Sequence, residues 1–158
     1  MNRAKKNPQD KIEIKARNFT SGRVFPLRFF EDLAKEVLKA QKIPAAHITI
    51  LLVSASFIKS LNKRYLSRNK ATDVLSFDLK PFGLRKVRLF GDVVVSVDAA
   101  AKASKTHKVP FRQELCRYII HGILHLVGYN DKTEAGKKRM WKRQEELLND
   151  LFNARFCP

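Results

Sequence analysis

Two histidines interrupt an apolar segment of the chain that runs from Pro110 to Val127. The segment has the composition of a buried helix, and Gly128 follows it in a position suited to a left-handed cap. His121 and His125 are four residues apart, so they project from the same face of that helix, one turn from each other. The segment therefore predicts a buried helix that carries two neighbouring imidazoles near its C-terminal end.

Asp131 adds a carboxylate three residues after Gly128. Because glycine lets the chain turn back, Asp131 can approach the two imidazoles, whose spacing is that of H-E-x-x-H zinc sites. Three protein ligands leave one position of a divalent ion open for the water that the ion acidifies. We predict that His121, His125 and Asp131 bind one divalent metal ion. The alternative is that both histidines are hydrogen-bonded core residues and that Asp131 only belongs to a turn.

Gly122 separates this motif from that of the zinc proteases. Those enzymes use a glutamate directly after the first histidine as general base, and glycine carries no proton. A glycine inside a helix is about 1 kcal/mol less favourable than alanine, which indicates that something approaches the backbone closely there. We expect a substrate backbone to be that neighbour.

The charge of the chain indicates an anionic partner. Lys and Arg number 32 against 15 Asp and Glu, which gives a formal net charge of +17. No apolar run reaches the length of a bilayer span, and the N-terminus lacks the apolar core of a signal peptide. We therefore predict that the partner is nucleic acid rather than a membrane and that the location is cytoplasmic. We also predict no disulfide between Cys116 and Cys157 and no small-molecule organic cofactor. The alternative is that the charge is only a solvated surface.

Hydrophobic periodicity predicts an α+β fold. We expect strands at Ile12 and Ile14, in HITILLVSA from His47, in VLSFDL and in FGDVVVSV. We expect helices from Pro26 to Gln41, in SFIKSLNKRYL with Ser56 as its cap, from Pro110 to Val127 and after Thr133. A basic loop with Pro81 and Gly83 joins the last two strands. The pattern predicts a single domain over residues 12–152, a small mixed β-sheet packed with helices, with the metal site at the end of a buried helix. A mobile basic N-terminus (1–11) and a C-terminal tail (153–158) flank it.

Three separated motifs resemble the YbeY family of single-strand-specific endoribonucleases. They are NKRYLSRNKATDVLSF, FGDVVVSV and HGILHLVGY, in the order of that family, and the resemblance spans roughly Ile12 to Leu148. It implies a mixed sheet, action on ribosomal RNA in maturation and ribosome quality control, and a metal, usually taken as zinc, that three histidines hold in a basic cleft. By this resemblance His121 and His125 are the first two ligands, and the family's T-D/N-V-L-S-F segment contains Thr72, Asp73, Ser76 and Phe77.

The chain departs from the family pattern at two places. Asp131 stands where the third histidine is expected, which leaves a His2Asp group that suits zinc because carboxylate oxygen is a normal zinc ligand. Leu66 stands where the family has an arginine after the tyrosine of N-x-x-Y-R. We predict that Arg64 and Arg68, on either side of this gap, supply the catalytic cation and, with Lys70, bind RNA. The alternative is that both are ordinary surface arginines.

These motifs together predict a metal-dependent endoribonuclease, a hydrolase of RNA phosphodiester bonds whose partners are single-stranded ribosomal RNA and the ribosome. The alternative, which Leu66 favours, is a non-catalytic RNA-binding factor of ribosome assembly with a structural metal. Asp73 is expected to be a turn or cap residue, and Glu114 to interact with its helix dipole from the first turn. The alternatives are that Asp73 lines the site and that Glu114, which falls on nearly the same helix face as His121, is an acid that supports the metal ligands. His47 and His107 are expected to be structural.

Overall fold

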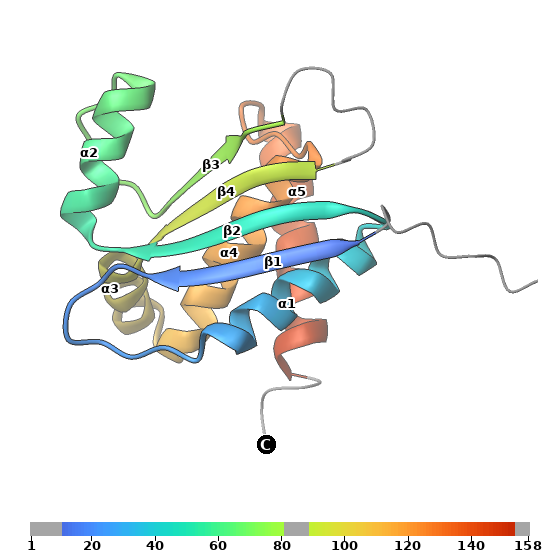
Figure 1. Cartoon of the computed structure of the whole chain (residues 1–158), viewed down its shortest axis with the longest axis horizontal. Helices are drawn as coiled ribbons and strands as arrows, with labels where there is room; N and C mark the ends of the chain where they lie inside the picture. Colours follow the sequence, from blue (N-terminus) through green and yellow to red (C-terminus); the bar gives the residue numbers. More distant parts are fainter. Residues whose placement is uncertain (1–10, 81–88, 154–158) are drawn as a thin grey trace, which may run out of the picture.

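The computed structural model of the protein describes residues 11–80 and 89–153. The strands are β1 (Ile12–Asn18), β2 (Ala46–Val53), β3 (Val74–Asp78) and β4 (Leu89–Ser96). The helices are α1 (Leu27–Ala40), α2 (Ala55–Leu66), α3 (Val97–His107), α4 (Phe111–Val127) and α5 (Glu134–Leu148), and a π-helical turn, η1 (Asn149–Asn153), follows α5. They form a single α+β domain built on a mixed sheet (Figure 1), which confirms the predicted fold class.

The four strands form one sheet in the order β1-β2-β4-β3. β1, β2 and β4 are parallel, whereas β3 runs antiparallel to β4. Alternate residues of the inner strands β2 and β4 are buried along their whole length, whereas the residues between them are buried only toward the C-terminal ends of the strands. One face of the sheet is therefore covered throughout and the other only in part. Helix α2 covers one face through a small cluster that includes Val53, Ile58, Leu75 and Val94. The larger core lies on the other face, between the sheet and α1 and α4.

Helix α4 lies at the centre of this larger core. Its buried side chains pack against the sheet, α1, α3 and α5: Leu115, Cys116, Ile119, Ile120, Ile123 and Leu124. At Gly122 the helix backbone itself contacts the sheet, since a Cβ atom there would collide with Val93 Cγ1 and lie 3.1 Å from Ser76 Oγ. The Ser76 hydroxyl also donates a hydrogen bond of 2.9 Å to the Gly122 carbonyl. The close neighbour of Gly122 is therefore the sheet, and the expectation that it is a substrate backbone is wrong.

The structure contains one helix that the sequence pattern did not predict. Helix α3 starts directly after β4, and its cap is Ser96, whose hydroxyl oxygen accepts a hydrogen bond from the Ala99 backbone N–H at 3.2 Å. The cap of α2 is Ser54 rather than Ser56, because the Ser54 hydroxyl oxygen accepts from the Phe57 N–H at 3.3 Å. The other predicted elements are present, with slightly shifted ends.

Cys116 behaves as an apolar core residue. Its side chain is fully buried, and this burial raises the pKa of the thiol to about 12. Cys157, the predicted loop with Pro81 and Gly83, residues 1–10 of the predicted N-terminal segment and most of the predicted tail lie outside the described residues. In the ranges that the structure describes, no helix combines the length and the apolar character that a membrane crossing needs.

The contact at Gly122 leads to a stability prediction of unusual sign. Exchange of a mid-helix glycine for alanine normally stabilises a helix by about 1 kcal/mol. Here the new methyl group would collide with Val93, so we expect Gly122→Ala to lower the free energy of unfolding by about 1–3 kcal/mol, as overpacked cores do. Urea unfolding followed by circular dichroism measures this change. An unchanged or higher unfolding midpoint would contradict the close packing of α4 on the sheet.

Candidate metal centre

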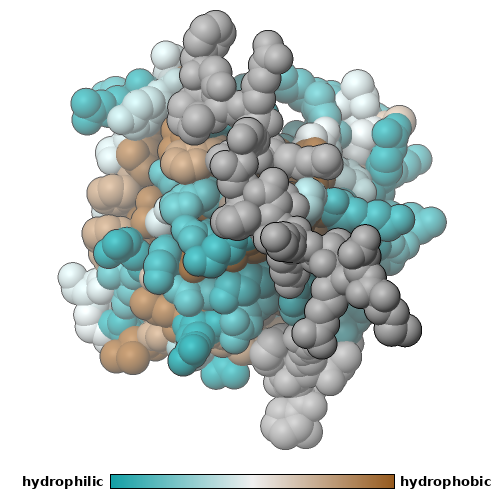
Figure 2. Space-filling model, turned by 45° about the vertical axis from the view of Figure 1, so that its right-hand side comes forward, coloured by the Kyte–Doolittle hydropathy of each residue, from teal (hydrophilic) through white to brown (hydrophobic). Residues whose placement is uncertain are grey.

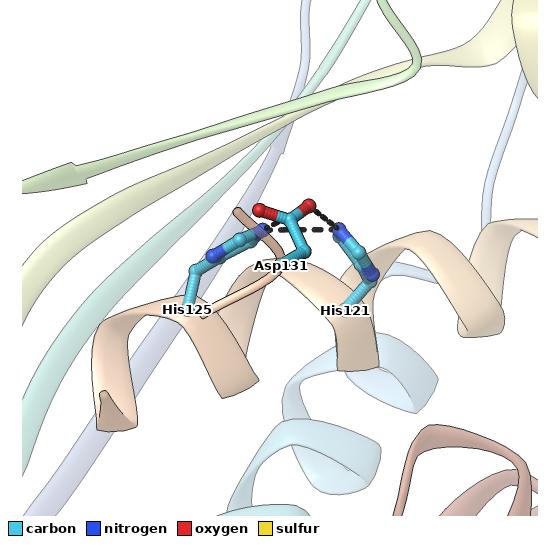
Figure 3. A group of neighbouring side chains, drawn as sticks. All are labelled: His121, His125 and Asp131. Atoms are coloured by element: carbon cyan, nitrogen blue, oxygen red, sulfur yellow. Dashed lines mark hydrogen bonds and ion pairs between the residues drawn. The ribbon is translucent and has the colours of Figure 1, made fainter. Parts of the chain in front are cut away.

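Three predicted metal ligands converge at the C-terminal end of α4. The His121 Nε2 and His125 Nε2 atoms are 3.1 Å apart, and Asp131 Oδ2 lies 4.0 Å from the first and 3.5 Å from the second. Figure 3 shows both imidazoles rising from α4 and the carboxylate lying between them, from the loop after the helix. The three ligand atoms lie within 4.8 Å of one another, a separation that one ion can bridge. The predicted juxtaposition is therefore present in the fold.

The loop that carries Asp131 is held by local hydrogen bonds. Gly128 ends α4 with a φ of 115°, as predicted, and the Gly128 and Tyr129 N–H groups donate to the Leu124 carbonyl at 3.1 and 3.0 Å. Beyond Asp131, Thr133 caps α5 by accepting from the Gly136 N–H at 3.0 Å. The backbone is thus fixed on both sides of Asp131, so the side chain returns toward α4 without an extended flexible loop.

Gln144, on α5, sets the hydrogen-bonding state of His121. Its Oε1 atom lies 2.8 Å from His121 Nδ1, while its Nε2 atom donates to Glu145 Oε1 at 3.1 Å. Because a carboxylate only accepts, the amide group faces Glu145 and the carbonyl oxygen faces the ring. His121 therefore donates from Nδ1, and the lone pair of Nε2 points toward His125 and Asp131. This is the tautomer that a metal bound at Nε2 requires.

A buried ionic network extends this support into the core. Arg117, on α4, donates to both oxygens of Glu145 at 2.8 and 3.3 Å and also pairs with Glu114, which is 1% exposed. Burial alone raises the pKa of Glu145, but the hydrogen bonds from Arg117 and Gln144 outweigh it, so the net direction is downward. Glu114 does more than interact with the helix dipole, since its buried carboxylate is a partner of Arg117 and joins the network behind His121, closer to the alternative of a supporting acid.

His125 is held in the form that a metal needs. Burial lowers the pKa of His125, and the neighbouring His121 lowers it further, against an opposing effect of Asp131. A neutral imidazole is the state that coordinates a divalent ion. The donor set also fits zinc chemistry, because two imidazoles and one carboxylate are ordinary zinc ligands that leave a coordination position open. The residues present therefore fit a catalytic type of metal ion.

A cavity of about 590 Å³ opens beside these ligands. It is lined by residues from four regions of the chain: Asp73 before β3; His107 from the end of α3; Glu114, Arg117, Tyr118, His121 and Asp131 from α4 and its loop; and Lys137, Lys138, Met140, Trp141 and Gln144 from α5. Burial first, then the charges of Asp73 and Glu114, raise the pKa of Tyr118 to about 12, so its hydroxyl remains neutral. Asp73 is a local turn residue, as expected, but it also reaches this cavity.

The predicted RNA-binding cations lie elsewhere. Arg68 and Lys70 line a second cavity, of about 610 Å³, which shares Asp73 with the first. Asn62 organises this loop, since its side-chain amide donates to the Lys70 carbonyl at 2.7 Å and its backbone carbonyl accepts from the Arg68 N–H at 3.3 Å. Arg64 is exposed, with its guanidinium 5.7 Å from the ring centre of Tyr65. The structure brings the three predicted metal ligands together but places these cations around a neighbouring cavity and on the end of α2.

Sequence reasoning did not identify Gln144, Arg117, Glu145 and His107 as neighbours of the site. Gln144 is 23 residues from His121, and Glu145 is 28 residues from Arg117. Such pairs leave no local spacing signal, and an amphipathic helix rich in charged residues offers several equivalent candidates. His107 was expected to be structural, but its ring is exposed, lies 3.6 Å from Glu114 and lines the cavity.

An α+β sheet protein with two histidines and a carboxylate at the end of a buried helix belongs to the class of candidate metal-dependent hydrolases. Comparison with known proteins assigns the family: the profile described as "Endoribonuclease YbeY" matches residues 7–152, and the chain belongs to this family. The resemblance of the three sequence motifs is thereby confirmed. The predicted enzyme class, endoribonuclease, is confirmed at the level of the family.

Individual relatives support the same assignment. The chain is 36% identical over 127 residues to the endoribonuclease YbeY of Persephonella marina, which covers 78% of this chain and 82% of the relative. It is 37% identical over 123 residues to the protein of the same name from Syntrophotalea carbinolica, with 75% and 81% coverage. The solution structure of TM1509 from Thermotoga maritima shares the fold, with a TM-score of 0.61, 25% identity, and coverage of 90% of this chain and 91% of that one.

The geometry predicts that Asp131 is a metal ligand. We expect wild-type protein reconstituted with zinc to hold about one ion per chain and Asp131→Ala to bind it more than 10-fold more weakly, since even partners outside the ligand set are worth about 10–100-fold. Asp131→His should retain binding. Competition with a chromophoric chelator measures these affinities, and Asp150→Ala removes an exposed carboxylate outside the cluster as a control. Equal affinities of wild type and Asp131→Ala would remove Asp131 from the ligand set.

Gln144 gives a second metal prediction. Its exchange for leucine removes the acceptor of the His121 Nδ1 hydrogen bond, so His121 is free to adopt the other tautomer. We expect Gln144→Leu to weaken zinc binding about 10- to 100-fold while the fold, followed by circular dichroism, persists. Gln113→Leu makes the same exchange at a residue outside the cavity. If both glutamine variants bind zinc as tightly as wild type, Gln144 does not position the ligand.

Proposed function

We propose that this protein is a metal-dependent, single-strand-specific endoribonuclease that acts on ribosomal RNA in maturation and ribosome quality control. The observation that carries the proposal is the convergence of His121, His125 and Asp131 beside a cavity, which His121 and Asp131 line, in a member of the YbeY family. The partners would be ribosomal RNA and the ribosome, and the compartment would be the cytoplasm. One domain over residues 12–152 would carry the activity.

In this proposal the two imidazoles and Asp131 hold a divalent ion, zinc. When bound, the ion polarises a phosphoryl oxygen and acidifies water. The residues of the chain orient the ligands. Gln144 fixes the orientation of the His121 ring, and Glu145, held by Arg117, fixes the orientation of the Gln144 amide. Their fixed dipoles and charges are arranged before the substrate arrives, which is the condition for effective stabilisation of developing charge.

Cations on the protein would hold the RNA backbone. We keep Arg64 and Arg68 as catalytic candidates and Lys70 as an RNA contact, because the cavity that contains Arg68 and Lys70 adjoins the metal cavity at Asp73. The net charge of +17 favours binding of a polyanion in general. On the face drawn in Figure 2, hydrophilic residues predominate and hydrophobic residues form smaller patches.

A second candidate function is a non-catalytic RNA-binding factor of ribosome assembly. Leu66 is the observation that favours it, because this residue ends α2 with about half of its surface exposed and offers no charge to a phosphate. In that case the ion would only brace the loop after α4 against the helix. The two functions differ in whether the protein cleaves the RNA strand that it binds, and cleavage can be measured.

We predict that zinc-loaded protein cleaves a labelled single-stranded ribosomal RNA fragment internally and leaves the matched duplex intact. A chelator should stop cleavage, and added zinc should restore it, because the open ligand position lies on the ion. The variant His125→Ala should be inactive and serves as a control for contaminating nucleases. Leu66→Arg should raise the cleavage rate by about 10-fold or more without a change in metal content, since removal of a comparable charge-stabilising donor lowers rates by about 10²–10³. Tight RNA binding without cleavage in either protein would favour the assembly factor.

A further inference from the structure

Trp141 is an exposed aromatic residue on the wall of the metal cavity. It is the only tryptophan of the chain, and 65% of its surface is exposed. It lines the same cavity as His121 and Asp131, yet within residues 11–80 and 89–153 no other aromatic ring stacks on it. An exposed indole contributes little to the hydrophobic core. Tryptophan is enriched at binding surfaces, because it combines a large apolar face with a polar N–H group.

The folding of α5 does not require this tryptophan. The helix is anchored in the core by Met140, Leu147 and Leu148, which are each at most 2% exposed. Lys137, Lys138 and Gln144 lie three or four residues from Trp141 and therefore share its side of the helix. This face lines the cavity, and Gln144 supports the metal ligand His121. The indole therefore lies about one helical turn, roughly 5 Å along the axis, from the residue that orients His121.

Charged side chains of both signs line the cavity, among them the carboxylates of Asp73 and Asp131. Arg117 is paired with Glu114 and Glu145. At the exposed side, Lys137 lies 3.5 Å from Glu134, whereas Lys138 has no salt bridge among the residues that the structure describes. Two lysines beside an exposed indole match the chemistry of a single nucleic-acid strand, whose bases present flat faces and whose phosphates are negative.

We propose that this cavity binds an unpaired base of the RNA strand, stacked on Trp141, with Lys138 at the adjoining phosphate. The inference rests on the proposed function, because it takes RNA as the substrate. It also supplies a physical reason for single-strand specificity: both faces of a base inside a duplex are covered by neighbouring bases, so such a base cannot stack on Trp141. Stacking on an indole is tolerant of base identity, so this contact selects strandedness rather than sequence.

The first experiment measures binding without cleavage. Metal-free protein in a chelator is titrated with a short, dye-labelled single-stranded RNA, and fluorescence anisotropy gives the affinity. Trp141→Ala should bind about 5- to 100-fold more weakly, the effect of one lost stacked base, and Trp141→Phe should stay within about threefold of wild type. Phe19→Ala, which removes another exposed aromatic residue outside the cavity, should bind like wild type. Circular dichroism and metal content verify that each variant is folded.

Two further measurements place the base and the phosphate. The fluorescence of the single tryptophan should fall on binding of unlabelled single strand and remain unchanged with duplex of equal length. An abasic site moved along the strand should abolish the fluorescence change at one position, and at this position Trp141→Ala should add no further loss of affinity.

Lys138→Ala should reduce the slope of log affinity against log salt by about 0.7, because one phosphate contact is lost. Lys142→Ala, on the same helix but outside the cavity, should bind more tightly than Lys138→Ala.

The outcomes separate this inference from the proposed function. If RNA binds but neither the fluorescence of Trp141 nor the affinity of Trp141→Ala changes, the stacking site is overturned while endoribonuclease activity stands. If stacking is observed and the zinc-loaded protein does not cleave, the base-binding site stands and the proposed function fails. If no single strand binds at any salt concentration, both are overturned.

Discussion

Close packing of α4 on the sheet at Gly122 positions the remainder of the site. The backbone of the helix lies against Val93, and the Ser76 hydroxyl donates to the Gly122 carbonyl. Any side chain at residue 122 would displace the helix, and with it the candidate metal ligands His121 and His125. Ser76 belongs to the segment VLSFD of β3, and Gly122 belongs to HGILHLVGY. Two of the motifs that carry the family resemblance, far apart in sequence, are therefore in direct contact in the fold.

Helix α5 supports the same site from the opposite side. Gln144 connects to His121, and Arg117 connects α4 to Glu145 and buried Glu114. A buried carboxylate without a partner would be strongly unfavourable, so this network is stable only when α4 and α5 are in register. Because the carboxylates fix Arg117 and Glu145 fixes the amide of Gln144, the orientation of the His121 ring depends on the docking of two helices rather than on its own helix alone.

Periodicity and spacing were sufficient for much of this architecture. The elements with alternating or helical apolar patterns were predicted, and His121, His125 and Asp131 were predicted because helix geometry and a glycine cap are local rules. Helix α3 was missed because VDAAAKASKTH has little apolar periodicity and Ser96 belongs both to the strand and to the cap. The strand order and the contacts of Gln144 join distant residues, so local pattern carries no information about them. Gly122 was correctly identified as a close-approach position, but only the fold shows that the sheet is its neighbour.

The two departures from the family pattern change charge in the same direction. Asp131 would replace a neutral ring by an anion, and Leu66 would replace a cation by an apolar side chain, so the net charge is lower by two than the family pattern implies. Lys137 and Lys138 return two cations to the wall of the cavity. Attraction of RNA depends on the summed field, so these lysines can restore affinity from a different place. Stabilisation of developing charge requires a donor within hydrogen-bond distance of one oxygen, which a rim lysine does not replace. The departures should therefore affect the rate of cleavage more than the affinity for the strand.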